Sequence, residues 1–216
     1  MKFFPENPIL VYRPFHLNER NYLYLADRGR IYGDVRLFDD QGTGIHFYTN
    51  REDTIADQEM TVELSRIDLK QFKKVLPYLP DVEGWLGGSL HYVDSEGQMM
   101  LSADMNLDNF VYEKSPLGNW TMSGAYLPGD NNAHHVDGFI TYNDQEIIYM
   151  NGVYQADETG QENITGELEL QHFPLRVINP FIPEKMVGFT GDIDGTLSMS
   201  GSPMKPVLNG GLQLDS

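Results

Sequence analysis

The chain has 216 residues, a formal net charge of −17 and no cysteine. This charge opposes contact with phosphate backbones and with anionic bilayer surfaces, so it argues against nucleic acid as a partner and against membrane docking through a basic patch. The lack of cysteine excludes disulfides, thiolate metal sites and cysteine nucleophiles, and the absence of any run of about 18 apolar residues predicts no membrane-spanning helix.

Alternation of apolar and polar residues predicts β-strands along most of the chain. Tyrosine (12) and phenylalanine (11) are frequent, and both favour half-buried strands. In residues 101–108, Leu101, Met105 and Leu107 share one parity, while serine, aspartate and asparagine take the other. Turn sequences rich in Gly, Pro, Asp and Asn separate such segments at intervals of about 8–12 residues, so about 15 strands fit. The sequence therefore predicts an all-β fold.

The first break in the alternation, at residues 67–79, predicts a short amphipathic helix. Its apolar positions fall at helical spacing. They are Leu69, Phe72, Val75 and Leu79. The preceding residues 65–68 read as a capping box, and Pro77 and Pro80 are expected to end the helix.

A second break, at residues 173–183, predicts one or two further helical turns. Pro174 suits a first helical turn and Pro180 is expected to stop the helix. We expect the apolar residues of both helical segments to plug or edge the sheet. They are Phe72, Val75, Leu79, Leu175, Ile178 and Phe181.

The two breaks belong to a unit that occurs twice. Residues 77–80, 84–90 and 105–109 match residues 180–183, 191–197 and 212–216 in the same order, with a register shift of four after the first match. Repetition of this kind predicts stacked units that bury their apolar faces against their neighbours. The expected organisation is an N-terminal strand segment (1–60), a first repeat unit (61–163) and the start of a second, truncated unit (164–216). The chain ends inside a strand pattern, which indicates a piece of a longer protein.

Three groups of residues resemble catalytic or metal-binding sites, but their sequence context argues against that function. His134 and His135 are adjacent, and in a strand they would point to opposite faces, so they cannot easily share one metal ion. Asp137 is in phase with His135 and could join it, but the sequence offers no convincing third ligand. The Ser-x-x-Lys spacing of residues 202–205 lies in a turn sequence, without the helix start that acyl-enzyme chemistry requires. Two further carboxylates, at positions 192 and 194, are expected on a solvated strand face. We therefore expect no enzyme, no metal and no cofactor.

Several segments of the C-terminal quarter resemble one protein family. They are residues 168–170, 174–175, 179–183, 191–197 and 205–210. In this order they are similar to the C-terminal region of TamB-like translocation and assembly module proteins, in which a short Pro-Leu…Pro-Phe-x-Pro helix is followed by Gly-punctuated strands. The resemblance is close over residues 164–216 and moderate over residues 61–109.

The resemblance implies a segment of an AsmA-like, bridge-forming lipid-transport protein of the Gram-negative envelope. Such a protein is anchored in the inner membrane and crosses the periplasm as an elongated, curled sheet, antiparallel or mixed, with a β-taco-like apolar groove. Its implied partners are phospholipid acyl chains and, through the parent chain, an outer-membrane assembly barrel protein. This piece itself would be soluble and non-catalytic. The expected groove-lining residues are Leu101, Met105, Leu107, Ile193, Leu197, Met199, Leu212 and Leu214.

Two other functions and one other architecture stay open at this point. Trp85 and Trp120 could stack on sugars, which suggests a carbohydrate-binding or adhesive β-sandwich, and paired carboxylates could hydrolyse glycosides. Alternation alone favours a closed sandwich or barrel over an open groove, and the resemblance reverses that order. Unpaired strand edges would also allow an edge-to-edge dimer of the fragment.

Overall fold

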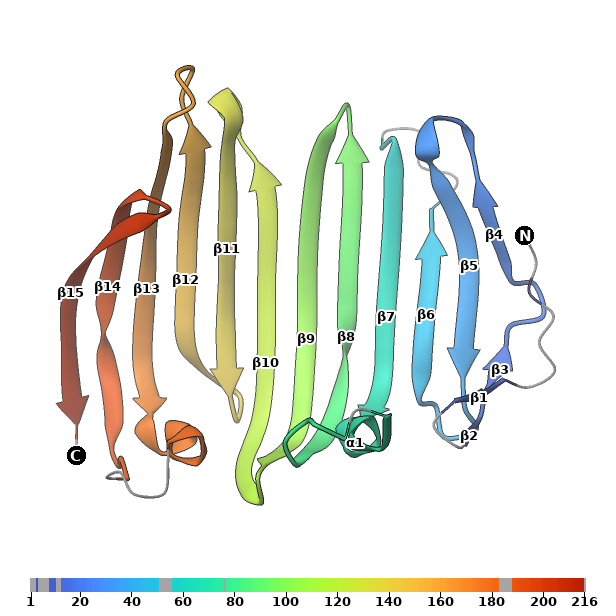
Figure 1. The fold of residues 1–216 in the computed structure, drawn as a ribbon, viewed down its shortest axis with the longest axis horizontal. Helices are drawn as coiled ribbons and strands as arrows, with labels where there is room; N and C mark the ends of the chain where they lie inside the picture. The colour runs from blue at the N-terminus through green and yellow to red at the C-terminus, as the bar shows by residue number, and fades with distance from the viewer. Residues whose placement is uncertain are drawn as a thin grey trace.

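The computed structural model describes residues 3, 8–10, 13–50, 56–75, 77–182 and 188–215. These residues form 15 strands with a few short helical segments between them (Figure 1). The strands are β1 (Ile9–Leu10), β2 (Arg13–Pro14), β3 (His16–Leu17), β4 (Tyr22–Leu25), β5 (Ile31–Phe38), β6 (Gly44–Thr49), β7 (Gln58–Asp68), β8 (Val82–Ser95), β9 (Gln98–Tyr112), β10 (Ser115–Pro128), β11 (Ala133–Tyr142), β12 (Gln145–Ala156), β13 (Glu162–Pro174), β14 (Asp192–Ser202) and β15 (Lys205–Asp215). The helical segments are η1 (Asp27–Gly29), η2 (Leu69–Gln71), α1 (Phe72–Val75), η3 (Asp130–Asn132) and η4 (Leu175–Phe181).

Thirteen of the strands form one open antiparallel sheet. From β5 to β15 each strand pairs with the next in the chain, while β3 and β4 both pair with β5, and β1 pairs with β2 separately. The predicted all-β fold is therefore confirmed, with only antiparallel pairing among the described strands. The two ends of the sheet do not join into a barrel. A sheet of this width is expected to curl or flatten, since strongly twisted open sheets rarely exceed about ten strands without doing so.

The strand register places apolar residues on one face from end to end of the sheet. One row of directly paired residues crosses every strand from β3 to β15 except β4. It runs Leu17, Leu37, Ile45, Leu64, Gly88, Met105, Met122, Ile140, Ile148, Leu170, Gly195 and Leu212. The next row, on the opposite face, is mostly polar, and its first members are Arg36, His46, Glu63, Ser89 and Asp104. We call these surfaces the apolar face and the polar face.

The two copies of the repeated sequence adopt the same succession of structures. In β7 the register with β8 shifts between Leu64 and Ile67, and in β13 the register with β14 shifts between Leu170 and Phe173. Each bulge is followed by a short helical segment, and both segments lie at the same end of the strands (Figure 1). A bulge re-aims the chain at a strand end, which lets each strand pass into its helical turn.

The first helix is shorter than the sequence predicts, and the predicted capping box is wrong. Ile67 continues β7 and pairs with Leu86, and the helical turns cover only η2 and α1. Asp68 ends the strand, and its carboxylate accepts hydrogen bonds from the Lys70 backbone N–H (3.0 Å) and from the Gln71 side chain (2.8 Å). These two bonds satisfy donors at the start of the turn, so the cap lies three residues later than predicted.

The second helical segment is longer than the sequence predicts. η4 begins directly after Pro174, as expected, but it contains Pro180 rather than stopping before it. Pro180 is the sixth of the seven residues of η4, so its missing backbone N–H removes only a hydrogen bond of the last turn. No helix within the described ranges is long and apolar enough to cross a membrane.

Candidate functional site

The eight residues expected to line a groove all lie on the apolar face. Leu101, Met105 and Leu107 alternate on β9. The other five belong to β14 and β15, namely Ile193, Leu197, Met199, Leu212 and Leu214. Strands β10 to β13 separate the two groups, and the residues in register with them on those strands continue the apolar face between them.

Much of the apolar face is open to solvent. Ten of its large apolar side chains are exposed. They are Leu25, Ile45, Leu90, Met99, Leu101, Met122, Val136, Leu208, Leu212 and Leu214. The exposed fraction is 47% for Met122, which lies on β10 in the middle of the sheet and not at its edge. Contiguous exposed apolar surface of this kind marks an interaction site, whereas scattered exposed apolar residues carry no such meaning.

A cavity of about 440 Å³ lies where η4 covers one end of the apolar face. Leu175 and Val177 are buried and hold η4 in place. Phe181 packs against Tyr112 at the end of β9, with 4.4 Å between the ring centroids, so η4 reaches from β13 to a strand four places away. The cavity is lined by Leu86, Met105, Asn106, Leu107, Phe110, Leu117, Trp120, Thr121, Met122, Ile140, Phe173, Val177, Ile178 and Phe181. Its size and apolar lining are typical of a ligand pocket.

The residues expected to plug or edge the sheet lie in different environments. Ile178 and Phe181 line the cavity, and Leu175 anchors η4 from a buried position. Leu79 is half-buried in the turn that follows α1. The side chains of Phe72 and Val75 lie outside the described part of the chain.

Trp120 is the most informative cavity residue that the sequence interpretation misplaced. We expected it as a candidate sugar platform, but its ring lines the cavity, and its indole N–H donates to the carbonyl oxygen of Leu117 (2.7 Å). The signal was present in the sequence, since Trp120 and Met122 alternate with Thr121 and Ser123. Trp120 therefore belongs to the apolar face and provides an intrinsic fluorescent reporter of its occupancy.

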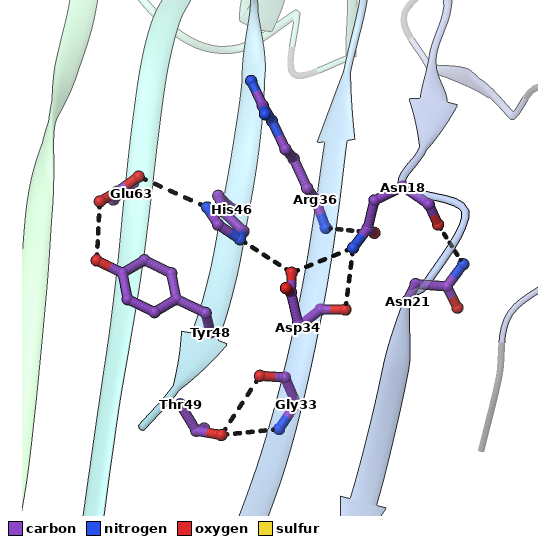
Figure 2. A network of polar contacts seen from close by, with 9 residues as sticks. All are labelled: Asn18, Asn21, Gly33, Asp34, Arg36, His46, Tyr48, Thr49 and Glu63. Atoms are coloured by element: carbon purple, nitrogen blue, oxygen red, sulfur yellow. Dashed lines mark hydrogen bonds and ion pairs between the residues drawn. The ribbon is translucent and has the colours of Figure 1, made fainter. Parts of the chain in front are cut away.

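The polar face carries a network of hydrogen bonds and ion pairs across β5, β6 and β7 (Figure 2). His46 lies between two carboxylates, with Nε2 3.0 Å from Asp34 and Nδ1 3.6 Å from Glu63. The Tyr48 hydroxyl donates to Glu63 (3.0 Å), and Asn18 donates to Asp34 (3.1 Å). These contacts link neighbouring strands side to side, which suits a structural role.

We expect stability to fall at high pH partly through Tyr48. Its hydroxyl donates to the Glu63 carboxylate and is partly buried, and both effects raise the pKa of Tyr48 above the ordinary value of 10.0. Because the folded pKa is the higher one, this contribution is complete below about pH 10 and is lost as the pH rises through the folded pKa. Unfolding free energies measured in urea from about pH 8 to pH 12 should fall less steeply for Tyr48→Phe than for the wild type. Equal slopes for the two proteins would contradict this assignment.

The groups that resemble catalytic or metal sites are not assembled into one. His134 lies on the apolar face and contacts Tyr126 and Tyr154, whereas His135 lies on the opposite face. Ser202 and Lys205 face each other across the hairpin turn between β14 and β15. Among the residues that the structure describes, no group of three or more His, Asp or Glu side chains could hold a metal ion.

The chain was compared with known protein families, with curated protein sequences and with solved structures, and none of them matches it. The apolar face and its cavity therefore carry the functional argument.

Proposed function

We propose that this chain is a non-catalytic segment that binds phospholipid acyl chains along its apolar face. The observation that carries the proposal is the apolar face, which crosses an open sheet and leaves ten large apolar side chains exposed to solvent. An apolar surface of this extent is stabilised when something apolar removes it from water. Acyl chains can follow such a surface continuously from strand to strand.

Two features favour acyl chains over a second copy of this sheet. The net charge of −17 opposes close contact between two copies. η4 and its Phe181–Tyr112 contact also cover one end of the apolar face, and this obstructs the flat approach of another sheet. Flexible acyl chains can enter beside η4, because methionines and aliphatic side chains line the space there.

We further propose that the parent protein is a TamB-like lipid-transport protein of the Gram-negative periplasm, with an outer-membrane assembly barrel as its partner. The support is the resemblance in residues 164–216 together with the repeated succession of bulge, helical turn and strand. An open sheet with one apolar face is the architecture that a lipid conduit requires.

The rival carbohydrate-binding sandwich has less support. Apart from the 13-stranded sheet, the described residues form only the two-residue pair β1–β2, which is too small to be the second sheet of a sandwich. Trp85 lies on the polar face, but the Arg66 guanidinium lies over its ring, 5.3 Å from the centroid, and occupies a face on which a sugar would stack. The lipid proposal therefore accounts for more of the exposed surface.

The proposal is tested by recovering lipid from the protein. The 216-residue chain is incubated with phospholipid vesicles, separated from them by size, and extracted for mass spectrometry. We expect phospholipid to be retained, with a shift of Trp120 emission to shorter wavelength as acyl chains displace water. Recovery of lipid-free protein, whether monomeric or dimeric, would overturn the proposal for this segment.

A further inference from the structure

The apolar face changes in character along its strands. Towards η4 the residues on β8 are aliphatic, Leu86 and Leu90, and towards the other end they become Tyr92 and then Asp94. On β7 the partner of Asp94 is Gln58. The face therefore has an aliphatic end, which holds the cavity under η4, and a polar end at the β8–β9 hairpin. This hairpin lies at the opposite end of the strands from η4 (Figure 1).

On strands β10 to β12 the apolar face also changes from aliphatic residues near η4 to residues with polar groups at the other end. At their polar end three rings adjoin: the His134 ring lies 5.7 Å from those of both Tyr126 and Tyr154. The Tyr126 hydroxyl contacts His134, and the Tyr154 hydroxyl donates to Glu162 (2.9 Å). Such rings have an apolar body and a polar tip, so they suit a boundary between acyl chains and water.

A second cavity, of about 340 Å³, lies at the polar end of β7 and β8. It is lined by Gly29, Arg30, Ile31, Asp57, Gln58, Met60, Tyr92 and Asp94. Arg30 donates to Asp57 (2.6 Å), and the other oxygen of Asp57 accepts from the Glu96 backbone N–H (2.9 Å). The Gln58 side-chain amide accepts a hydrogen bond from the Ile31 backbone N–H and donates one to the Ile31 carbonyl oxygen. The side chains of Asp57 and Gln58 are thus already hydrogen-bonded within the protein.

Asp94 also lines this cavity, and one of its two carboxylate oxygens lacks a partner. Its Oδ1 is buried and has no hydrogen-bond partner among the described residues. The cavity also contains one guanidinium and two carboxylates, so one negative charge is unmatched. A buried carboxylate oxygen without a donor is costly, and a ligand cation next to the Asp94 carboxylate would offset that cost.

We propose that this cavity receives the headgroup of a phospholipid that carries a primary ammonium, with Asp94 accepting from the ammonium. The inference rests on the proposed function, because the acyl chains of the same lipid would lie along the apolar face towards η4. The six residue steps from Leu86 to Tyr92 span about 20 Å by strand rise, which exceeds the roughly 15 Å of half a bilayer's hydrocarbon core. Arg30 lines the same cavity and is placed to approach the headgroup phosphate.

A competition between two headgroups tests this assignment. The 216-residue chain is incubated with vesicles containing equal amounts of phosphatidylethanolamine and phosphatidylglycerol with identical acyl chains, and the lipid retained by the protein is quantified. We expect phosphatidylethanolamine to exceed phosphatidylglycerol by about fivefold, the range of a partly exposed ion pair. Asp94→Asn keeps the shape of the side chain and should return the ratio to that of the vesicles. Glu96→Gln makes the same change of charge outside the cavity and should leave the preference intact.

The outcomes separate this inference from the proposed function. Lipid retained by the wild type without headgroup preference, or a preference that survives Asp94→Asn, would overturn the headgroup assignment and leave acyl-chain binding standing. Retention of neither lipid would overturn both.

Discussion

Replacing Met122 with arginine is expected to lower the amount of lipid retained by the chain about tenfold or more. Met122 lies on the apolar face of β10, lines the cavity under η4 and is 47% exposed. Acyl chains at this position would have to cover a guanidinium without a partner, which is costly in an apolar environment. Because the side chain is exposed before lipid binds, the substitution leaves the fold intact.

Ser123→Arg is the matched control for this experiment. Ser123 is the next residue of β10 and lies on the polar face, where its hydroxyl donates to Asp104 (2.6 Å). An arginine there meets a carboxylate and adds the same charge to the chain. Lipid retention should stay within about twofold of the wild type, since the change touches only the solvated face. Equal losses in the two variants would show that net charge, and not the apolar face, controls retention.

Replacing Gly88 with alanine is expected to destabilise the chain by about 3 kcal/mol. Gly88 has a φ of +133°, and a Cβ built there would lie 2.2 Å from the carbonyl oxygen of Asp104. The obstacle is backbone of the paired strand β9, so it cannot rotate away. Gly195, the equivalent residue of the second repeat, has a φ of +151° and the same conflict with the carbonyl oxygen of Gly211. The repeated unit thus requires glycine at this position.

Gly87→Ala tests whether backbone geometry, and not simple loss of a glycine, explains this effect. Gly87 precedes Gly88 on β8, and its nearest obstacle is the Asn106 side-chain oxygen at 2.7 Å, which can move aside. Its stability should remain within about 1 kcal/mol of the wild type. Urea unfolding followed by tryptophan emission measures both variants. Similar stabilities for Gly87→Ala and Gly88→Ala would contradict the strained geometry.

The sequence was sufficient to predict most of the strands because the sheet has one apolar and one polar face. Wherever that difference holds, period-two alternation appears directly, as in Leu101, Met105 and Leu107. The prediction from alternation failed at residues 65–68. There the bulge at Ser65 and Arg66 interrupts the period of two, and the sequence resembles a capping box. Bulges depend on the paired strand, so a local pattern does not reveal them.

The candidate site was predicted only in part. The eight expected lining residues do share one face, but β5 to β7 and β10 to β13 supply as much of it. The cavity depends on η4 reaching Tyr112 through Phe181, a contact between residues 69 positions apart in the sequence. The second cavity, at the polar end of β7 and β8, likewise joins Arg30 to Asp94. Both cavities arise from strand order and from the long-range reach of side chains, which periodicity does not encode.

The central claim, that one face of this sheet binds acyl chains, is tested most directly by photocrosslinking along β9. A photoreactive amino acid is placed singly at each position from 101 to 107, and each variant is irradiated with phospholipid and analysed for lipid adducts. Leu101, Met105 and Leu107, together with position 103, lie on the apolar face, and the three positions between them lie on the polar face. We predict adducts at the four odd positions and none at positions 102 and 104; position 106 is left out of the comparison because Asn106 borders the cavity under η4. Adducts of equal yield at both parities, or none at any position, would contradict the account.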